Sequence, residues 1–297
     1  MKHYIKGRKV TGFIMKKILA LILAVCVIFA FAACSNEAAN TDGQNGAASS
    51  YADLTVVEGL DLAVEEYGIG FRSGSDIVPA VDAIIAELYN DGTLKAIAEK
   101  YDLADNLKAP AQVESRASGE SDLEYVKGKG KLTIGYTVYE PMNYTNEAGE
   151  FVGFDTEFAK AVCEKLGVEA EFVEIDWDTK EIELNAKSID CIWNGFTINE
   201  EREENLDFSI PYILNKQVVV IRKADAEKYV DTASLADARL VAETTSAGEG
   251  AIKDDENLSK AEYTAVAKQT DALLEVKSNT ADAAVLDYTL ANAMVGR

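Results

Sequence analysis

Histidine and cysteine are scarce in this chain of 297 residues, and their scarcity excludes several kinds of site. His3 is the only histidine, and it lies in an N-terminal region that has the pattern of a secretion signal. Imidazole-based catalytic triads are therefore excluded from the mature protein. The four cysteines lack the paired spacing of zinc sites, and Cys163 and Cys191 are expected to be buried thiols rather than a disulfide. We expect neither a metal nor a cofactor.

Basic side chains are also few. The chain has 29 Lys and Arg residues against 51 Asp and Glu residues. Residues 1–34 carry six of the basic residues and no acidic one, so the remainder has 23 basic residues and a formal charge of −28. This charge excludes nucleic acid and anionic lipid as partners. A hydrophobic fraction of 48% is sufficient for two modest cores.

Residues 1–34 have the pattern of a bacterial signal peptide. Six Lys and Arg residues precede an apolar run of 16 residues at 18–33, which is too short to span a membrane. The sequence FAAC at 31–34 resembles a lipoprotein cleavage box, in which Cys34 is lipidated; cleavage without lipid is the alternative. Residues 35–50 lack large apolar side chains and are expected to form a flexible tether with a reach of roughly 20–24 Å.

Beyond residue 50 the apolar pattern alternates between short strands and helices, which predicts an α/β layer fold. Asp155 is expected to cap the helix that follows the strand at 132–134. The other strands are expected at 54–57, 68–71, 172–175, 189–192, 218–221, 240–242 and 283–286, and the clearest helices at 77–89, 179–186 and 270–276.

Residues 189–212, IDCIWNGFTINEEREENLDFSIPY, carry the strongest indication of a binding site. Asn194 and Gly195 are expected to break a buried strand, so that successive N–H groups point at an anion beside the planar guanidinium of Arg202. This arrangement would clamp a carboxylate. The alternative is that Arg202 is a solvated helix charge among four neighbouring glutamates, and the residues alone leave both interpretations open.

The same run resembles extracellular solute-binding proteins of family 3, which serve ABC importers of amino acids. It matches their pattern D-x-x-x-x-G-x-T-I-x-x-x-R followed by F-S-x-P-Y. Further matches are LTIGYTVYEPMNYTNEAGEFVGFD at 132–155, DAAVLD at 282–287 and EEYGIGF at 65–71. The resemblance covers nearly the whole mature chain. It implies a two-lobed α/β fold of the periplasmic-binding-protein type II class, in which the lobes close on a ligand.

The order of these motifs differs from that of the family. The segment at 66–101, which comes last in the family, here precedes the first strand at 132. We interpret the chain as circularly permuted, with residues 109–122 as a linker between the old ends. Fusion of a fragment of one copy to an incomplete second copy is the other history. Lobe 1 is then expected at 68–108 and 123–216, and lobe 2 at 51–67 and 217–297, with crossings near 67–71 and 216–220.

The resemblance implies a site for a free amino acid in the cleft between the lobes. Arg202 and the backbone N–H of Thr197 would hold the carboxylate, and the Gly195 carbonyl or Asn194 would face the ammonium group. Asp287 would also accept from the ammonium group, and its alternative role is an ordinary helix N-cap.

Two further parts of the site are implied in the same way. Thr245, Ser246 and Ala247 form a turn before a helix, where free N–H groups suit an anion, although many family members have Gly in place of Thr245. Tyr139 matches an aromatic lid over the ligand. Tyr136 and Trp177 are weaker candidates, and Trp193 is expected in the core.

We therefore predict a monomeric, lipid-anchored protein outside the cytoplasm that captures a free, polar L-amino acid and delivers it to an ABC permease. It would act on the periplasmic side or the outer face of a bacterial membrane, and it would not be an enzyme. Two alternatives remain open. One is an enzyme that resembles cyclohexadienyl dehydratases, and the other is a ligand sensor or a nonproductive fusion that does not serve transport.

Overall fold

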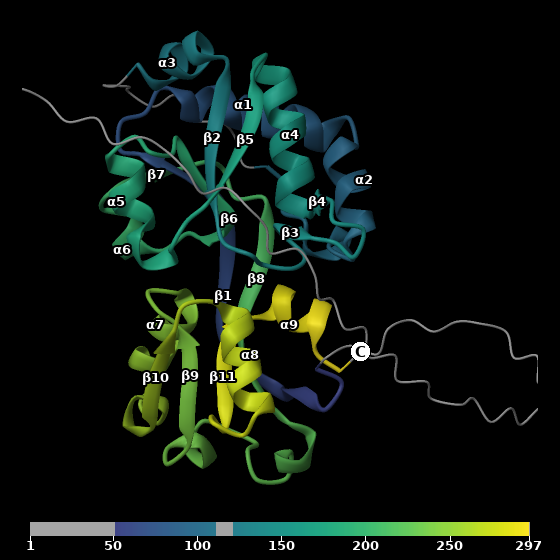
Figure 1. Cartoon of the computed structure of the whole chain (residues 1–297), viewed down its shortest axis with the longest axis vertical. Coiled ribbons are helices and arrows are strands. Elements are labelled where there is room, and N and C mark those ends of the chain that lie inside the picture. Colours follow the sequence, from purple (N-terminus) through teal and green to yellow (C-terminus); the bar gives the residue numbers. More distant parts are fainter. Residues whose placement is uncertain (1–50, 111–120, 297) are drawn as a thin grey trace, which may run out of the picture. The chain divides into compact units, whose positions relative to one another are not determined.

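The computed structural model describes residues 51–110 and 121–296 (Figure 1). The predicted signal peptide with Cys34, the tether and most of the linker lie outside the described residues. The described residues all belong to one compact unit, and the description below concerns that unit alone.

The described residues build one mixed sheet of nine strands. Its order is β10-β9-β11-β8-β1-β6-β2-β5, and β7 pairs with β1 beside this path. The strands are β1 (Leu54–Arg72), β2 (Lys131–Tyr136), β5 (Glu169–Glu174), β6 (Cys191–Thr197), β7 (Leu206–Phe208), β8 (Ile213–Arg222), β9 (Arg239–Glu243), β10 (Glu262–Val266) and β11 (Ala283–Asp287). A separate pair is formed by β3 (Tyr144–Thr145) and β4 (Phe151–Val152).

The helices gather at two ends of this sheet, as Figure 1 shows. In the upper group, which we call lobe 1, are α1 (Ile77–Asn90), α2 (Thr93–Lys100), α3 (Asp122–Lys129), α4 (Phe154–Leu166), α5 (Lys180–Asn185) and α6 (Glu200–Glu203). In the lower group, lobe 2, are α7 (Ala247–Asp254), α8 (Gln269–Lys277) and α9 (Tyr288–Met294). The predicted two-lobed α/β fold is confirmed.

Strands β1 and β8 run from one lobe to the other. They pair antiparallel from Leu54 opposite Arg222 to Tyr67 opposite Ile213. The prediction of separate strands at 54–57 and 68–71 is therefore wrong, because β1 is continuous over 19 residues. Between the two predicted strands, apolar residues alternate with others at Leu60, Leu62 and Val64. This alternation is the sequence pattern that indicates the middle part of β1. The predicted lobe boundaries at 67/68 and 216/217 both fall within these strands.

Strand β6 does not end at Asn194 and Gly195, contrary to prediction. It continues to Thr197, and its pairing with β1 shifts register opposite Gly68 and Gly70, which marks a β-bulge. Gly195 has a φ of +56°, and a Cβ atom there would lie 2.8 Å from the Tyr139 ring. Both the positive φ and this close approach require glycine. A bulge of this kind changes the direction of side chains at a binding site.

Asp155 does not cap α4, and this prediction is also wrong. The N-cap of α4 is Gly153, whereas the carboxylate of Asp155 accepts a hydrogen bond of 2.6 Å from the Gly195 N–H. Burial raises the pKa of Asp155 to about 7, although the Gly195 N–H lowers it. Asp155 thus holds the β6 bulge against α4. A smaller correction concerns the linker predicted at 109–122, since Asp122 is already the first residue of α3.

Cys163 and Cys191 are both free and buried, as predicted. Within the described ranges, no group of three or more His, Cys, Asp or Glu side chains is placed to hold a metal ion. None of the helices in the same ranges combines the length and the apolar character that crossing a membrane requires.

Arg72, at the end of β1, joins several parts of lobe 1. Its guanidinium donates to Asp122 at 3.0 Å and to the carbonyls of Leu184 and Ile189 at 3.0 Å each. Burial raises the pKa of Asp122, but the hydrogen bonds from Arg72 and Ser75 and the charge of Arg72 outweigh it, so the pKa lies below its usual value.

Arg72→Met is expected to lower the free energy of unfolding by about 3 kcal/mol near neutral pH, because Asp122 would stay buried without its guanidinium partner, with only Ser75 and the partly exposed Lys187 beside it. The pKa of Asp122 is depressed in the folded state, so its stabilisation is present above the unfolded pKa and is lost as the pH falls. The difference should therefore shrink below about pH 4. Urea denaturation followed by circular dichroism measures both values. Lys95→Met, in an exposed ion pair with Glu99, is the control; equal losses for the two variants would contradict the expectation.

Candidate functional site

The cleft between the lobes has an outer and an inner part. The outer cleft, of about 910 Å³, lies beside β1, α5, α6 and α7, and its lining includes Lys180, Arg202 and Thr245. The inner cavity has a volume of only about 10 Å³. It is lined from lobe 1 by Tyr139, Trp177, Asn194, Gly195, Thr197 and Arg202, and from lobe 2 by Glu243, Ser246, Ala247, Gln269 and Asp287.

The inner cavity is too small for any amino acid. A cavity needs about 10–15 Å³ to hold one water molecule, so this one holds at most about one. A molecule of amino-acid size would fit only if the lobes moved apart, and such a motion would involve β1 and β8, the paired strands that join the lobes.

Arg202 lies in α6, where its backbone N–H donates to the side chain of Asn199, the N-cap. The side chain is only 7% exposed, so the alternative of a solvated helix charge is wrong. Its guanidinium donates to the Thr197 carbonyl at 2.6 Å and to the Thr245 carbonyl of lobe 2 at 3.3 Å, and it stacks on Phe196. Burial lowers the pKa of Arg202, but a guanidinium remains charged at neutral pH.

Thr245 connects lobe 2 to two cations of lobe 1. Its carbonyl accepts from Arg202, and its hydroxyl accepts from Lys180 at 3.0 Å. Its φ of +53° is in the left-handed region, where a residue other than glycine costs about 1–2 kcal/mol.

The predicted turn at 245–247 does lie at the start of α7. Ser246 is the N-cap, and its hydroxyl accepts from the Glu249 N–H at 3.1 Å. The Thr245 N–H is not free to bind an anion, because it donates to the Glu249 carboxylate at 2.8 Å. Glu249 thus bonds both the N-cap side chain and the backbone N–H of the residue before the N-cap, an arrangement close to a capping box. Ser246 and Ala247 line the inner cavity, whereas Thr245 lines the outer cleft.

Asn194 and Gly195 line the inner cavity with groups that already have partners. The Asn194 side chain bonds Thr137 and Asn143 through both its oxygen and its nitrogen. The Gly195 N–H is held by Asp155. The side chain of Asn194 therefore orders the β6 bulge.

Asp287 ends β11 and precedes α9. Its side chain makes no capping hydrogen bond to α9, so the alternative of an ordinary N-cap is wrong. Its carboxylate instead accepts from the side-chain amides of Asn215 at 2.8 Å, of Gln217 at 2.6 Å, and of Gln269. These donors come from β8 and α8 and fix the carboxylate at the wall of the inner cavity.

Glu65 lies beside this carboxylate, on β1. It accepts from the same two amides, Asn215 at 2.6 Å and Gln217 at 2.8 Å. Burial, followed by the negative charge of Asp287, raises the pKa of Glu65 to about 8. The side-chain amides of Asn215 and Gln217 thus link the carboxyl group of Glu65, on β1, to that of Asp287, in lobe 2.

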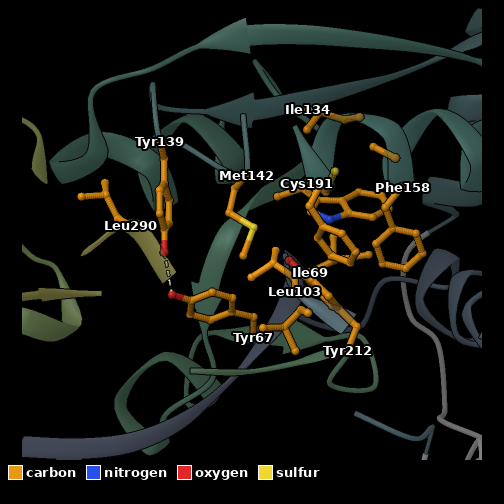
Figure 2. Close-up of a cluster of buried hydrophobic side chains, with 14 of the residues drawn as sticks. Tyr67, Ile69, Leu103, Ile134, Tyr139, Met142, Phe158, Cys191, Tyr212 and Leu290 are labelled. Atoms are coloured by element: carbon orange, nitrogen blue, oxygen red, sulfur yellow. Dashed lines mark hydrogen bonds between the residues drawn. The ribbon is translucent and has the colours of Figure 1, made fainter. Parts of the chain in front are cut away.

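Tyr139 closes the inner cavity from lobe 1. Its hydroxyl group bonds the Tyr67 hydroxyl at 2.8 Å, and Figure 2 shows the two rings pointing toward each other beside Met142 and Leu290. The same hydroxyl bonds the Thr289 hydroxyl of α9, in lobe 2. Tyr139 is therefore part of the contact between the lobes.

The structure adds residues that the sequence interpretation did not include in the site. Glu243 and Gln269 line the inner cavity, and so does Trp177, which the sequence gave only as a weaker candidate. Glu243 could have been noticed as a lone acid directly after the apolar strand residues 240–242. Trp193 packs edge-on against Phe158 in the core, as predicted.

Comparisons with known proteins agree with this architecture. L-cystine-binding protein TcyJ of Escherichia coli (strain K12) is 35% identical over 120 residues, which are 40% of this chain and 45% of that protein. The arginine-binding extracellular protein ArtP of Bacillus subtilis (strain 168) is 30% identical over 181 residues, 59% of this chain and 68% of that protein.

Among solved structures, the ancestral amino acid-binding protein AncCDT-1, a precursor of cyclohexadienyl dehydratase, superposes with a TM-score of 0.55 and 32% identity. The superposition covers 58% of this chain and 76% of that one. The family model of bacterial extracellular solute-binding proteins, family 3, matches residues 132–293, which are more than half of the chain. This chain therefore belongs to the bacterial extracellular solute-binding proteins of family 3.

Proposed function

We propose that this protein captures a free L-amino acid between its two lobes and delivers it to an ABC permease. The observation that carries the proposal is the placement of Arg202 and Asp287, which line one inner cavity from opposite lobes with opposite charges. An amino acid carries the same two charges in complementary positions. The names of the relatives, which bind cystine and arginine, support the same class of ligand.

In this proposal the carboxylate of the ligand binds Arg202, whose guanidinium has five N–H donors and uses two of them on backbone carbonyls. Ser246 and Ala247, at the start of α7, lie against the same group. The ammonium group binds Asp287, and the ring of Tyr139 covers the ligand. Thr197 and Gly195 form the floor of the cavity on β6.

Closure of the lobes is the signal that the permease would sense. An open form admits the amino acid, and a closed form resembles the arrangement described above, in which Tyr139 bonds Thr289 across the cleft. The ligand favours closure because its charges replace water around Arg202 and Asp287.

We also propose that the order of segments in this protein is circularly permuted. The family model begins at residue 132, and β1 and α1 lie before it in the chain. In space, β1 pairs with both β8 and β6, and Tyr51 bridges Val295. Residues 51–108 thus supply structural elements to the same sheet. The lobe boundaries, the tether and the linker predicted from the sequence belong to this proposal.

The location of the protein completes the proposal. We place it outside the cytoplasm as a monomer, attached to a bacterial membrane by lipid on Cys34 after removal of the signal peptide.

A dehydratase of the cyclohexadienyl type is the second candidate. The observation that favours it is Glu65, a buried carboxyl group at the outer cleft whose pKa is raised to about 8, as a general acid requires. The ancestral relative named as a precursor of such an enzyme is consistent with it. Turnover of prephenate or arogenate by the purified protein would favour this candidate over a transport protein.

Arg202→Met is expected to weaken amino-acid binding at least about 30-fold, because the carboxylate of the ligand would be buried without a counter-ion. The apolar replacement of similar volume should leave the melting temperature of the ligand-free protein nearly unchanged. Isothermal titration calorimetry against the twenty common amino acids measures binding. Arg239→Met, which removes an arginine paired with Asp282 away from the cleft, is the matched control. Retention of affinity within threefold in Arg202→Met would contradict the assigned role.

Thr289→Val should raise the dissociation constant about fivefold, because the closed form loses one hydrogen bond between Tyr139 and lobe 2, worth about 1 kcal/mol. Small-angle scattering should show a less complete closure at equal ligand concentration. Thr280→Val removes an exposed hydroxyl of the same lobe and serves as the control. An unchanged dissociation constant would show that this contact does not contribute to closure.

Cys34→Ala is expected to move the protein from the membrane fraction of the host to the soluble fraction, because the lipid attachment point would be lost. Detergent partitioning and mass spectrometry of the mature N-terminus test this directly. If wild type and variant fractionate alike, lipid anchoring at Cys34 is wrong.

A further inference from the structure

Glu243 is a buried acid whose carboxylate has no partner. It ends β9, is 3% exposed, and lines the inner cavity together with Trp177, Gln269 and Asp287. Within the described part of the chain, its carboxylate makes no hydrogen bond and no ion pair. The other two acids of this region differ, since Asp287 accepts from three amides and Glu65 from two. A buried carboxyl group without a partner either holds its proton or is stabilised as a carboxylate by a cation from outside the chain.

The charges that line the inner cavity are unequal. Arg202 is the one cation in the lining, against the two acids Glu243 and Asp287. The carboxylate of a bound amino acid neutralises Arg202, and its ammonium group neutralises Asp287. Glu243 is then the remaining acidic group, and it becomes a charge when it gives up its proton. A ligand with a second positive group would balance it, whereas a neutral or acidic side chain would not.

We propose that Glu243 is a specificity-determining residue that binds the positively charged side chain of the captured amino acid, which makes cationic amino acids the ligand class. The inference rests on the proposed amino-acid-binding function. Trp177 lines the same cavity, and its ring already attracts one cation, since the Lys180 ammonium group lies 4.8 Å from the ring centroid.

Lys180 is the neighbouring cation that could otherwise neutralise Glu243. It forms no ion pair with Glu243, and its ammonium group donates to the Trp177 carbonyl at 3.0 Å and to the Thr245 hydroxyl at 3.0 Å. Burial, followed by the charge of Arg202, lowers the pKa of Lys180 to about 8. Lys180 therefore closes the cleft by bonding Thr245 and leaves Glu243 to the ligand.

The outer cleft has the charge that this ligand class requires. Seven of its lining residues are acidic and three are basic. A cleft lined mainly by one sign of charge concentrates ligands of the opposite sign and accelerates their association. The approach to the inner cavity thus favours cationic amino acids before any contact with Glu243.

Binding is coupled to proton release. Burial and then the charge of Asp287 raise the pKa of Glu243 to about 8, with a smaller contribution from Asp271, while Lys180 and Arg202 act in the opposite direction. At pH 6–7 the ligand-free carboxyl group holds its proton, and a cation must displace it. The dissociation constant should therefore fall by up to about tenfold for each pH unit between 6 and 8.

The test is calorimetric titration of wild-type protein and Glu243→Gln with L-arginine, L-lysine, L-glutamine, L-leucine and L-glutamate at pH 6, 7 and 8. Two buffers of different ionisation enthalpy report the number of protons released. Wild type should bind arginine or lysine at least 30-fold more tightly than glutamine and release close to one proton at pH 7. In Glu243→Gln, this preference and the proton release should both disappear, while glutamine binding stays within threefold.

Glu262→Gln removes one acid from the exposed strand β10 of the same lobe and is the matched control, with wild-type preference expected. Melting temperatures of all three proteins show whether each is folded. A preference for leucine or glutamate in wild type, or a preference for arginine that survives in folded Glu243→Gln, would overturn the inference. If wild type binds none of these five, and none of the twenty common amino acids in the titration described for Arg202→Met, the proposed function itself is rejected.

Discussion

Charges buried at the interface of two lobes must be neutralised, and this constraint governs the whole cleft. Lobe 1 presents Arg202 and lobe 2 presents Asp287 and Glu243 to a cavity that holds at most about one water molecule. Backbone carbonyls and side-chain amides compensate part of this cost, as they do for Asp287. The rest of the cost of burying these charges is best offset by a bound molecule that has charged groups of its own. In the proposed function, binding and closure are therefore one process.

The rest of the structure supports these charges with rigid elements. The bulge in β6 is held by Asp155 from α4, and it places Gly195 against the Tyr139 ring. The two long strands β1 and β8 connect the lobes, and β8 carries two of the amides that order Asp287. Thr245 adopts a strained left-handed conformation and accepts bonds from two cations of the opposite lobe. Strain of this kind persists where surrounding contacts over-determine it, often at ligand sites.

The predictions that the structure contradicts fail for one physical reason. Asn194 and Gly195 look like a strand break, because both residues favour turns, yet β1 pairs with β6 on either side of them and the strand continues as a bulge. Asp155 has the local pattern of a helix cap, but a backbone N–H from a strand forty residues later satisfies it instead. In each case a tertiary partner, which local patterns do not contain, decided the outcome. Glu243 escaped notice for the same reason, since a lone acid after an apolar strand acquires meaning only beside Asp287.

The sequence by itself determined the α/β class, most helices and strands, the family and the two buried thiols. These follow from hydrophobic periodicity and from motifs that are contiguous in the chain. Only the tertiary structure decided that Arg202 is buried, that Asp287 does not cap its helix, and that Glu243 has no partner among the residues the structure describes. These properties depend on groups from β1, β8, α8 and the opposite lobe, which approach one another only when the sheet is assembled. Burial and the electrostatic neighbours of a charge are set by the folded arrangement rather than by spacing along the chain.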